Sequence, residues 1–226
     1  MNRYADILLA LLLAVFTVQA QAGIVIGGTR IIYNGDKKET SASIRNPDRS
    51  GVWLVQSWVD SGMKGSKTPF IVTPPLFRIN PGEENILRIV RTGGRLPEDR
   101  ESVFWLNVKS IPATDDSTAH NNVLQVVVKS RLKLFYRPAG LEGHPETAYH
   151  HLSVSRSGNR LTVSNPTSYY VTLFTLKADG QEIKEADMVP PKGSVSFTLP
   201  STTVSTVTWQ AISDYGGVSQ TESRKL

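Results

Sequence analysis

Apolar side chains along this chain recur with a period of two, and the wider period expected of helices is hard to find after Gly23. Short runs rich in β-branched and aromatic residues are separated by Gly, Pro, Asn, Asp and Ser, which is the pattern of strands and turns. In one run, Phe104, Leu106 and Val108 share a face. The pattern therefore predicts an all-β protein.

The predicted strands fall into two sets. In the first half of the chain they are Gly23–Ile26, Arg30–Tyr33, Glu39–Asn46, Val52–Val59, Phe70–Thr73, Leu76–Ile79, Glu84–Arg91, Val103–Ile111 and Val123–Tyr136. In the second half they are Leu152–Arg156, Arg160–Ser164, Tyr170–Lys177, Glu182–Met188, Ser194–Leu199 and Thr206–Ser213.

Turn residues indicate how these strands are divided. Asn34-Gly35-Asp36 and Asp179-Gly180 are each predicted to form a tight hairpin turn, because Asn-Gly and Asp-Gly readily take positive φ. Arg137-Pro138-Ala139-Gly140 ends the last strand of the first set, and the stretch from Leu141 to Thr147 is expected to be a linker. We therefore predict two tandem immunoglobulin-like β-sandwiches, residues 23–142 and residues 143–226.

Residues 1–22 have the features of a secretory signal peptide. Arg3 gives a positive start, Ile7 to Val18 is a short apolar run, and Ala20-Gln21-Ala22 is a small-x-small cleavage site, so the mature chain is expected to start at Gly23. A transmembrane anchor is the alternative, but crossing a bilayer takes about 20 apolar residues. We expect an exported protein that is not embedded in a membrane.

Composition narrows the classes of function. The chain has no cysteine, which excludes thiol catalysis, cysteine-ligated zinc and iron–sulfur clusters. The net charge is +5, but the basic residues are spread along the chain, as on an ordinary solvated surface. Because export argues against nucleic acid as a partner, an anionic or carboxylate-bearing partner fits this charge better.

No motif for catalysis or cofactor binding is visible. The sequence lacks a G-x-S-x-G elbow, an H-E-x-x-H helix, a P-loop and a dinucleotide fingerprint, so we expect neither an enzyme nor a cofactor. His144, His150 and His151 could bind zinc, but no carboxylate accompanies them at metal-site spacing, and surface histidines are the better interpretation. Asp115 and Asp116 point to opposite faces of an extended chain, which favours a polar turn.

The last predicted strand of the first set is unusually long. Leu124, Val126 and Val128 lie on one face, and Leu132 and Leu134 continue the same phase. One interpretation is a strand within the core, because buried strands are often continuously apolar. The other is an edge strand, normally an aggregation hazard, that completes the sheet of another protein. The sequence leaves open which part faces a partner.

A series of motifs runs over nearly the whole mature chain: Gly28-Thr29-Arg30-Ile31-Ile32-Tyr33, Phe70-Ile71-Val72-Thr73-Pro74-Pro75, Leu96 to Asn107, Ser130 to Pro138, Asn165-Pro166-Thr167-Ser168-Tyr169-Tyr170 and Ser213-Asp214-Tyr215-Gly216. Each motif is modest, but together and in order they are specific. They resemble the motifs of the periplasmic pilus-assembly chaperones of the chaperone–usher pathway. A short polar stretch before Leu124 resembles the short-loop subgroup, which includes the chaperones of type 1 and P pili.

The resemblance implies that the two immunoglobulin-like domains form an L shape with a cleft. Arg30 and Lys133 are expected to anchor the C-terminal carboxylate of a pilus subunit there. Both residue types suit this role, because Arg offers a fork of donors and Lys a compact charge. Without the motifs, either residue would be taken for a solvated charge.

The resemblance also assigns a donor strand. Leu124, Val126 and Val128 match its alternating apolar residues, which insert into a subunit that lacks its own final strand. Each could contribute about 1.5–3 kcal/mol if fully buried. Backbone pairing supplies the rest of the affinity and depends little on side chains.

Three charged residues, Glu101, Arg137 and Asp214, match family positions near the domain interface. They are expected to hold the two domains at a fixed angle, and loss of one member would strand a partner charge. Thr73-Pro74-Pro75 matches a family turn in which a cis proline can occur.

The implied function is that of a periplasmic chaperone that works without ATP. It would bind, fold and cap pilus subunits and deliver them to an outer-membrane usher.

One alternative is a secreted adhesin or pilus subunit, but this chain shows neither a single incomplete sandwich nor an N-terminal donor extension. A carbohydrate-active enzyme would need a carboxylate pair across a cleft, and no part of the chain is left over for a catalytic domain. Self-association of the free chaperone stays open.

Overall fold

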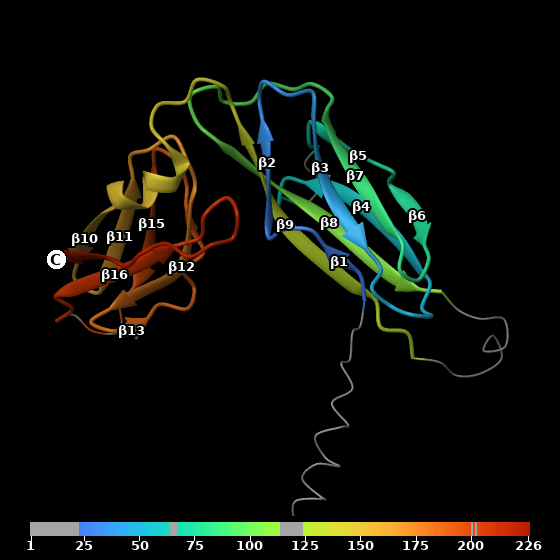
Figure 1. The fold of residues 1–226 in the computed structure, drawn as a ribbon. Helices are drawn as coiled ribbons and strands as arrows, with labels where there is room; N and C mark the ends of the chain where they lie inside the picture. Colours follow the sequence, from blue (N-terminus) through green and yellow to red (C-terminus); the bar gives the residue numbers. More distant parts are fainter. Residues whose placement is uncertain (1–22, 64–66, 114–123, 200, 202) are drawn as a thin grey trace, which may run out of the picture.

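The computed structural model describes residues 23–63, 67–113, 124–199, 201 and 203–226. The predicted signal peptide and the Asp115–Asp116 pair lie outside these residues. The described chain forms two β-rich domains that meet at an angle, which gives an L-shaped outline (Figure 1). The predicted all-β fold with two sandwiches in tandem is confirmed.

The first domain packs a four-stranded sheet, in the order β1-β3-β7-β5, against a five-stranded sheet, in the order β2-β9-β8-β4-β6. Alternate residues face inward from both sheets, and Ile44, Leu87 and Leu106 are completely buried between them. The strands are β1 (Val25–Ile26), β2 (Arg30–Asn34), β3 (Glu39–Arg45), β4 (Trp53–Asp60), β5 (Phe70–Thr73), β6 (Leu76–Ile79), β7 (Glu84–Arg91), β8 (Ser102–Pro112) and β9 (Val128–Arg137).

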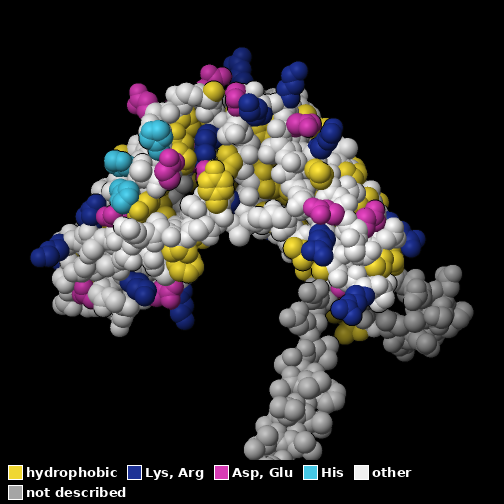
Figure 2. Space-filling model, viewed as in Figure 1, with side chains coloured by type: hydrophobic (Ala, Val, Ile, Leu, Met, Phe, Trp, Pro, Cys, Tyr) yellow, Lys and Arg dark blue, Asp and Glu magenta, His cyan; other side chains and the backbone are white. Residues whose placement is uncertain are grey.

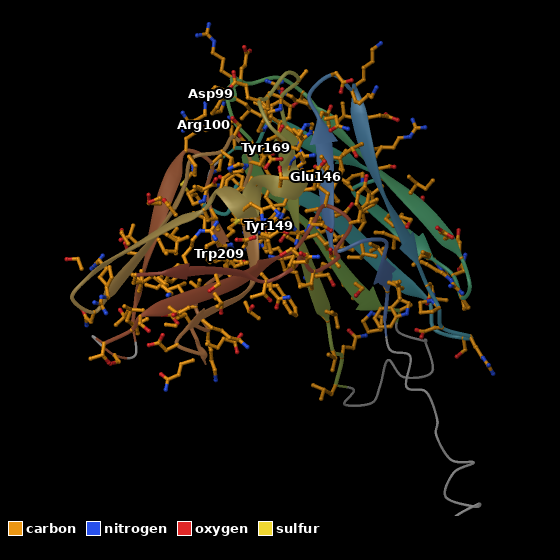
Figure 3. All side chains as sticks on the ribbon, turned by 60° about the vertical axis from the view of Figure 1, so that its left-hand side comes forward. Asp99, Arg100, Glu146, Tyr149, Tyr169 and Trp209 are labelled. Carbon is orange, nitrogen blue, oxygen red and sulfur yellow. The ribbon has the colours of Figure 1, made fainter. Side chains whose placement is uncertain are left out.

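The second domain packs a sheet in the order β10-β11-β15 against one in the order β13-β12-β16-β17, in which β14 also pairs with β12. Its core surrounds Trp209, whose Nε1 donates a hydrogen bond to the Tyr149 carbonyl at 3.0 Å (Figure 3). Its elements are η2 (Pro145–His151), β10 (Ser153–Ser157), β11 (Arg160–Asn165), β12 (Val171–Ala178), β13 (Gln181–Glu182), β14 (Met188–Val189), β15 (Gly193–Thr198), β16 (Thr206–Ala211) and β17 (Glu222–Lys225).

The second domain departs from the predicted elements in three places. The prediction of one strand over Glu182–Met188 is wrong, because only the two ends of this segment lie in strands, in β13 and β14. β17 was not predicted, since Glu222–Lys225 is polar and pairs only with β16. The predicted linker ends early, because Pro145 starts the 3₁₀ helix η2, a position that suits its fixed φ.

Of the two predicted hairpin turns, one is confirmed. Asp179 and Gly180 have positive φ values of 45° and 84° and connect β12 to β13. The Asn34-Gly35-Asp36 hairpin is wrong, because the turn joins two different sheets: β2 pairs with β9, and β3 with β7. The Gly35 amide donates to the Arg137 carbonyl at 2.7 Å, which prolongs the β2–β9 pairing. The Thr73–Pro74 peptide is cis.

The N-terminal segment changes sheets between β1 and β2, and two glycines permit this. A Cβ atom at Gly27 would lie 2.2 Å from the Ser43 hydroxyl oxygen, and Gly28 has a φ of +84°, a region favoured by glycine. β1 pairs with β3 in one sheet, whereas β2 pairs with β9 in the other. β2 therefore reaches the second sheet only at Arg30.

Candidate functional site

The late start of β2 leaves half of β9 with a free edge. From Lys133 to Arg137, β9 lies between β2 on one side and β8 on the other. From Val128 to Leu132, which we call the open half, it pairs with β8 alone among the described residues. A free strand edge exposes unpaired N–H and C=O groups and can accept another strand.

The apolar row of this segment also divides at this point. Leu134 is completely buried and Leu132 nearly so, whereas the exposed fractions of Leu124, Val126 and Val128 are 89%, 65% and 47%. The interpretation as a strand wholly within the core is therefore wrong. The predicted strand was also too long at its start, because β9 begins at Val128.

On the opposite face of the open half, two cations lie over tryptophan rings. The Lys129 Nζ atom lies 5.1 Å from the centre of the Trp58 ring, and the Arg131 Cζ atom lies 4.5 Å from that of Trp105. Arg131 also donates to Asp60 Oδ1 at 3.0 Å. Cation–π contacts of this kind contribute about 0.5–1 kcal/mol at exposed sites. They hold the open half against β8 and β4.

The open half leads into a cleft between the domains, and Arg30 and Lys133 lie at that junction. The two residues are paired neighbours at the first position of the β2–β9 ladder. A groove of about 330 Å³ contains both side chains, and the hollow between the domains is visible in Figure 2. The groove is lined from the first domain by Thr29, Arg30, Arg131 and Lys133, and from the second by Thr172, Leu173, Phe174, Asp187, Ile212, Gly216 and Val218.

Arg30 is desolvated and only partly satisfied. Its Nη1 donates to the Ile212 carbonyl at 3.0 Å, and its buried Nε has no hydrogen-bond partner among the described residues. Burial lowers the pKa of the guanidinium, although Asp214, Asp187 and Glu101 act in the opposite direction. A buried donor without a partner is costly, so an incoming acceptor would be favourable here.

Lys133 is already paired, with a residue that the sequence did not single out. Its Nζ donates to the carboxylate of Asp187 in the second domain. The Lys133 side chain is 19% exposed, and that of Asp187 is 66% exposed. Asp187 carried no sequence signal, because a contact between distant segments leaves no local pattern.

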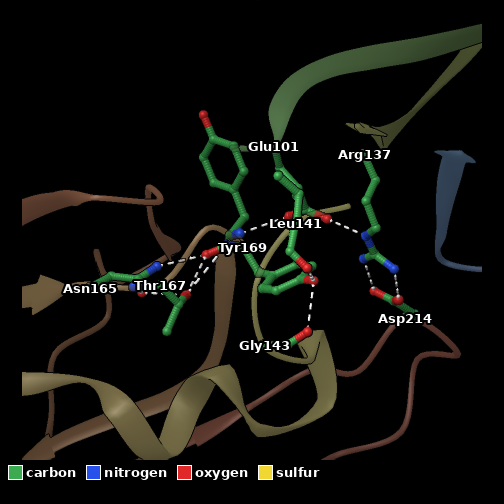
Figure 4. A network of polar contacts seen from close by, with 9 residues as sticks. Glu101, Arg137, Leu141, Gly143, Asn165, Thr167, Tyr169 and Asp214 are labelled. Atoms are coloured by element: carbon green, nitrogen blue, oxygen red, sulfur yellow. Dashed lines mark hydrogen bonds and ion pairs between the residues drawn. The ribbon is translucent and has the colours of Figure 1, made fainter. Parts of the chain in front are cut away.

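The structure brings Glu101, Arg137 and Asp214 together at the domain interface (Figure 4). Arg137 Nε donates to Glu101 Oε1 at 2.7 Å, while its two terminal nitrogens donate to the Asp214 carboxylate at 2.8 and 3.1 Å. Glu101 Oε2 also accepts the Tyr170 amide hydrogen at 2.7 Å. This fork of charge-assisted bonds fixes both the position and the orientation of the carboxylates.

Burial and charge pairing act in opposite directions on the pKa values of this network. Burial raises the pKa of the Glu101 carboxyl, even though Arg137 and the Tyr170 amide act in the opposite direction. For Arg137, burial acts to lower the pKa, but the bonds to Asp214 and the nearby Glu101 charge raise it overall. Arg137 therefore stays charged and supplies the counter-charge for both carboxylates.

The three histidines lie on the surface of the second domain around η2. His150 Nδ1 lies 2.6 Å from Glu222 Oε1, and His144 Nδ1 lies 4.0 Å from Glu146 Oε1. Within the described ranges, no three His, Cys, Asp or Glu side chains converge as metal ligands would. A search of the same residues finds no helix that is long and apolar enough to cross a membrane.

Two family models match nearly the whole described chain. Residues 23–142 match the N-terminal domain of the PapD pili and flagellar-assembly chaperones, and residues 147–223 match the C-terminal domain of the PapD pili assembly chaperones.

Individual relatives and solved structures agree with this match. The chain is 46% identical over 215 residues to the probable fimbrial chaperone LpfB of Escherichia coli O157:H7, covering 93% of each chain. It is 44% identical to the chaperone FimC of Escherichia coli K12, covering 88% of this chain and 83% of that one.

Among solved structures, the Escherichia coli chaperone DraB has a TM-score of 0.79 at 39% identity, with 90% of this chain and 96% of that chain covered. A chain from the Salmonella enterica complex of the SafA pilin with the SafB chaperone has a TM-score of 0.83 at 33% identity, with 92% and 99% covered. The named relatives are chaperones and not enzymes. This protein belongs to the PapD-like family of pilus-assembly chaperones.

Proposed function

We propose that this protein is a periplasmic chaperone that captures a pilus subunit by adding the open half of β9 to the subunit's incomplete sheet. The observation that carries the proposal is the free edge of the open half. The alternating exposed residues Leu124, Val126 and Val128 lead into it, and it ends at two cations. The Salmonella enterica relative in complex with a pilin supports a pilus subunit as the partner.

The direction of β2 predicts how the partner strand would lie. β2 runs parallel to β9 and begins opposite Lys133. A partner strand that continues the line of β2 along the open half would also run parallel to β9, and its C-terminus would meet Arg30 and Lys133. A terminal carboxylate there would satisfy the unpaired Nε of Arg30 and fix the register of the pairing.

The exposed apolar residues would supply the contact between the two proteins. Leu124, Val126 and Val128 lie outside their own core, so burying them in the subunit would cost nothing in the chaperone's packing. Full burial of each contributes about 1.5–3 kcal/mol. Backbone pairing tolerates different side chains, which allows one chaperone to serve several subunits.

We assign the network of Glu101, Arg137 and Asp214 the role of holding the interdomain angle. Its bonds join Arg137 at the end of β9 to Asp214, after β16 of the second domain, and Glu101, directly before β8, to the Tyr170 amide. We place the division between the domains at residues 142 and 143. A fixed angle would keep the cleft shaped for a subunit before one arrives.

Export to the periplasm and delivery to an outer-membrane usher belong to the same proposal. The signal-peptide pattern before Gly23 supports export. Subunit capture in the periplasm requires a later release step, and an usher that accepts the loaded chaperone would provide it.

The anchor can be tested by co-purification. We would express the chain in a bacterial periplasm with a candidate pilin subunit and compare wild type with Arg30→Ala and Lys133→Ala. We expect at least a tenfold loss of bound subunit in each variant, because an isolated cation cannot replace the pair and 1.4 kcal/mol corresponds to a factor of ten.

Arg88→Ala is the control, because Arg88 is likewise a strand cation but is exposed and lies in β7 on the other sheet. It should retain the subunit. If the two cleft variants stay folded and retain the subunit at the wild-type level, Arg30 and Lys133 are ordinary surface charges and the anchoring proposal is wrong.

A further inference from the structure

The counter-charge of Lys133 is supplied by the protein itself. The Lys133 side chain is largely buried in the groove, and its ammonium group contacts the Asp187 carboxylate of the opposite domain. A poorly solvated cation without a partner is destabilising, because its lost hydration is not replaced. In the empty chaperone, Asp187 removes this penalty.

Asp187 combines a hydrogen-bonded backbone with a largely exposed side chain. Its carbonyl accepts a hydrogen bond from the Leu173 amide at 2.8 Å, next to the irregularity in β12 between Leu173 and Thr175. The next residue, Met188, begins β14. The carboxylate is largely exposed, so it can turn into water by a change of side-chain rotamer, without any movement of the sheet.

Other contacts keep the domains together when this pair opens. Arg137 remains bonded to Asp214, and Lys192 Nζ lies 2.9 Å from Asp99 Oδ2 on another part of the interface. Release of Asp187 therefore leaves the cleft intact and frees one ammonium group within it.

We propose that Asp187 is an internal stand-in for the terminal carboxylate of the subunit. It occupies Lys133 in the empty chaperone and is displaced when a C-terminal carboxylate binds. This inference rests on the proposed anchoring role of Lys133. Loading is then an exchange of one carboxylate for another, in which Lys133 keeps a counter-charge in both the empty and the loaded state.

Zero-length cross-linking tests the exchange directly. A carbodiimide converts a touching carboxylate and amine into an amide, and mass spectrometry identifies the joined peptides. The probe is a synthetic peptide of about ten alternating Val and Thr residues, long enough at about 3.3 Å per residue to span the open half. It is prepared with a free C-terminal carboxylate and, separately, with a C-terminal amide.

We expect an Asp187–Lys133 product in the empty protein and at least a fivefold smaller yield with saturating free-acid peptide. The amide peptide should leave the yield unchanged. Lys192 and Asp99 provide an internal control, because this second interdomain pair should cross-link equally in all samples. The exchange is refuted if the product is missing from the empty protein or if its yield persists with free-acid peptide bound.

Binding of the same peptides to Asp187→Asn gives an independent measurement. Without the competing carboxylate, the free-acid peptide should bind roughly threefold more tightly, in keeping with the modest strength of a partly exposed ion pair. The gain should vanish in the Lys133→Ala background. A gain that persists there would indicate general repulsion by Asp187 and would overturn the stand-in role.

The peptide pair also separates this inference from the function on which it rests. If wild type binds the acid and the amide equally, Lys133 does not anchor a carboxylate, and the proposed function and the exchange both fail. If wild type prefers the acid but Asp187→Asn binds no more tightly, only the exchange fails.

Discussion

The two halves of β9 continue one row of alternate residues on the same face of the sheet, from Val128 to Tyr136, but they have different neighbours. From Lys133 onward the strand has two neighbours, and its inward residue Leu134 is completely buried. Before Lys133 it has one neighbour, and the same row of apolar residues becomes exposed towards Val128. Burial along this row therefore decreases from the paired half, through Leu132, to the free end at Val128.

This comparison shows how one strand can serve both the stability of its own domain and the binding of another. The paired half gains its free energy from its own core. The open half keeps Val128 exposed, as are Leu124 and Val126 before it. The Lys129–Trp58 and Arg131–Trp105 contacts hold it in place from the other face. Substitutions in the two halves should therefore affect different measurements.

The largest effect should come from truncating an apolar side chain in each half. Leu134→Ala should lower the free energy of unfolding by about 2–5 kcal/mol, because it leaves a cavity in the core. Val128→Ala, in the open half, should change it by less than about 0.5 kcal/mol, because the side chain is exposed, but should reduce subunit co-purification. Urea unfolding measures the first quantity. Equal destabilisation by the two variants would remove the distinction between the halves.

A smaller effect should follow from releasing the open half from the sheet beneath it. Arg131→Ala removes the contact with Trp105 and the ion pair with Asp60. Hydrogen exchange of the open-half amides bonded to β8 should speed up by about three- to fivefold, since such contacts contribute about 0.5–1 kcal/mol. The amides from Lys133 to Arg137 should not change.

Arg131→Lys is the companion variant. It keeps the charge but loses the flat guanidinium that stacks on an aromatic ring, and should give an intermediate rate. If neither variant changes exchange in the open half, the cation–π contacts do not order it.

The smallest effect should come from protonating Asp60, the ion-pair partner of Arg131, at low pH. Burial acts to raise the pKa of Asp60, but the Gly62 amide, Asn107 and Arg131 bond to its carboxylate and lower the pKa below the usual 3.8. A lowered pKa means that this group stabilises the fold above pH 3.8, and that the contribution is lost as the pH falls through the folded-state value. The Nε–H signal of Arg131 in NMR spectra should therefore shift below pH 3.8.

Asp60→Asn is the control for this titration, because the amide cannot ionise. Its Arg131 signal should stay constant over the same pH range. A shift of equal size in this variant would show that another group is responsible.

The sequence was sufficient for the features that depend on local pattern. Alternation located most strands to within one or two residues, and the motifs pointed to Glu101, Arg137 and Asp214, which the structure brings together. The assignment of each strand to one of the two sheets was harder to predict from the sequence. A turn such as Asn34-Gly35-Asp36 has similar residues whether it joins strands of one sheet or of two.

Contacts between distant segments were missed for a related reason. Asp187 lies in the stretch that was predicted as the strand Glu182–Met188, and only the docking of the domains brings it to Lys133. Trp58 and Trp105 looked like ordinary strand aromatics, because the register of β4 against β8 and β9 decides which cations they meet. One sequence contains no record of these spatial neighbours.

If Lys133 anchors a terminal carboxylate as proposed, its position at the end of the open half would also set the register of the bound strand. Side chains of a strand change face at every residue. The number of residues between a side chain and a fixed terminal carboxylate would therefore decide which face that side chain occupies. A subunit lengthened by one residue at its C-terminus would turn its whole apolar row to the wrong face, whereas two added residues would restore the faces and displace the row by about 7 Å. Recognition by such a cleft would depend on the position of the subunit's C-terminus and only weakly on its amino-acid sequence.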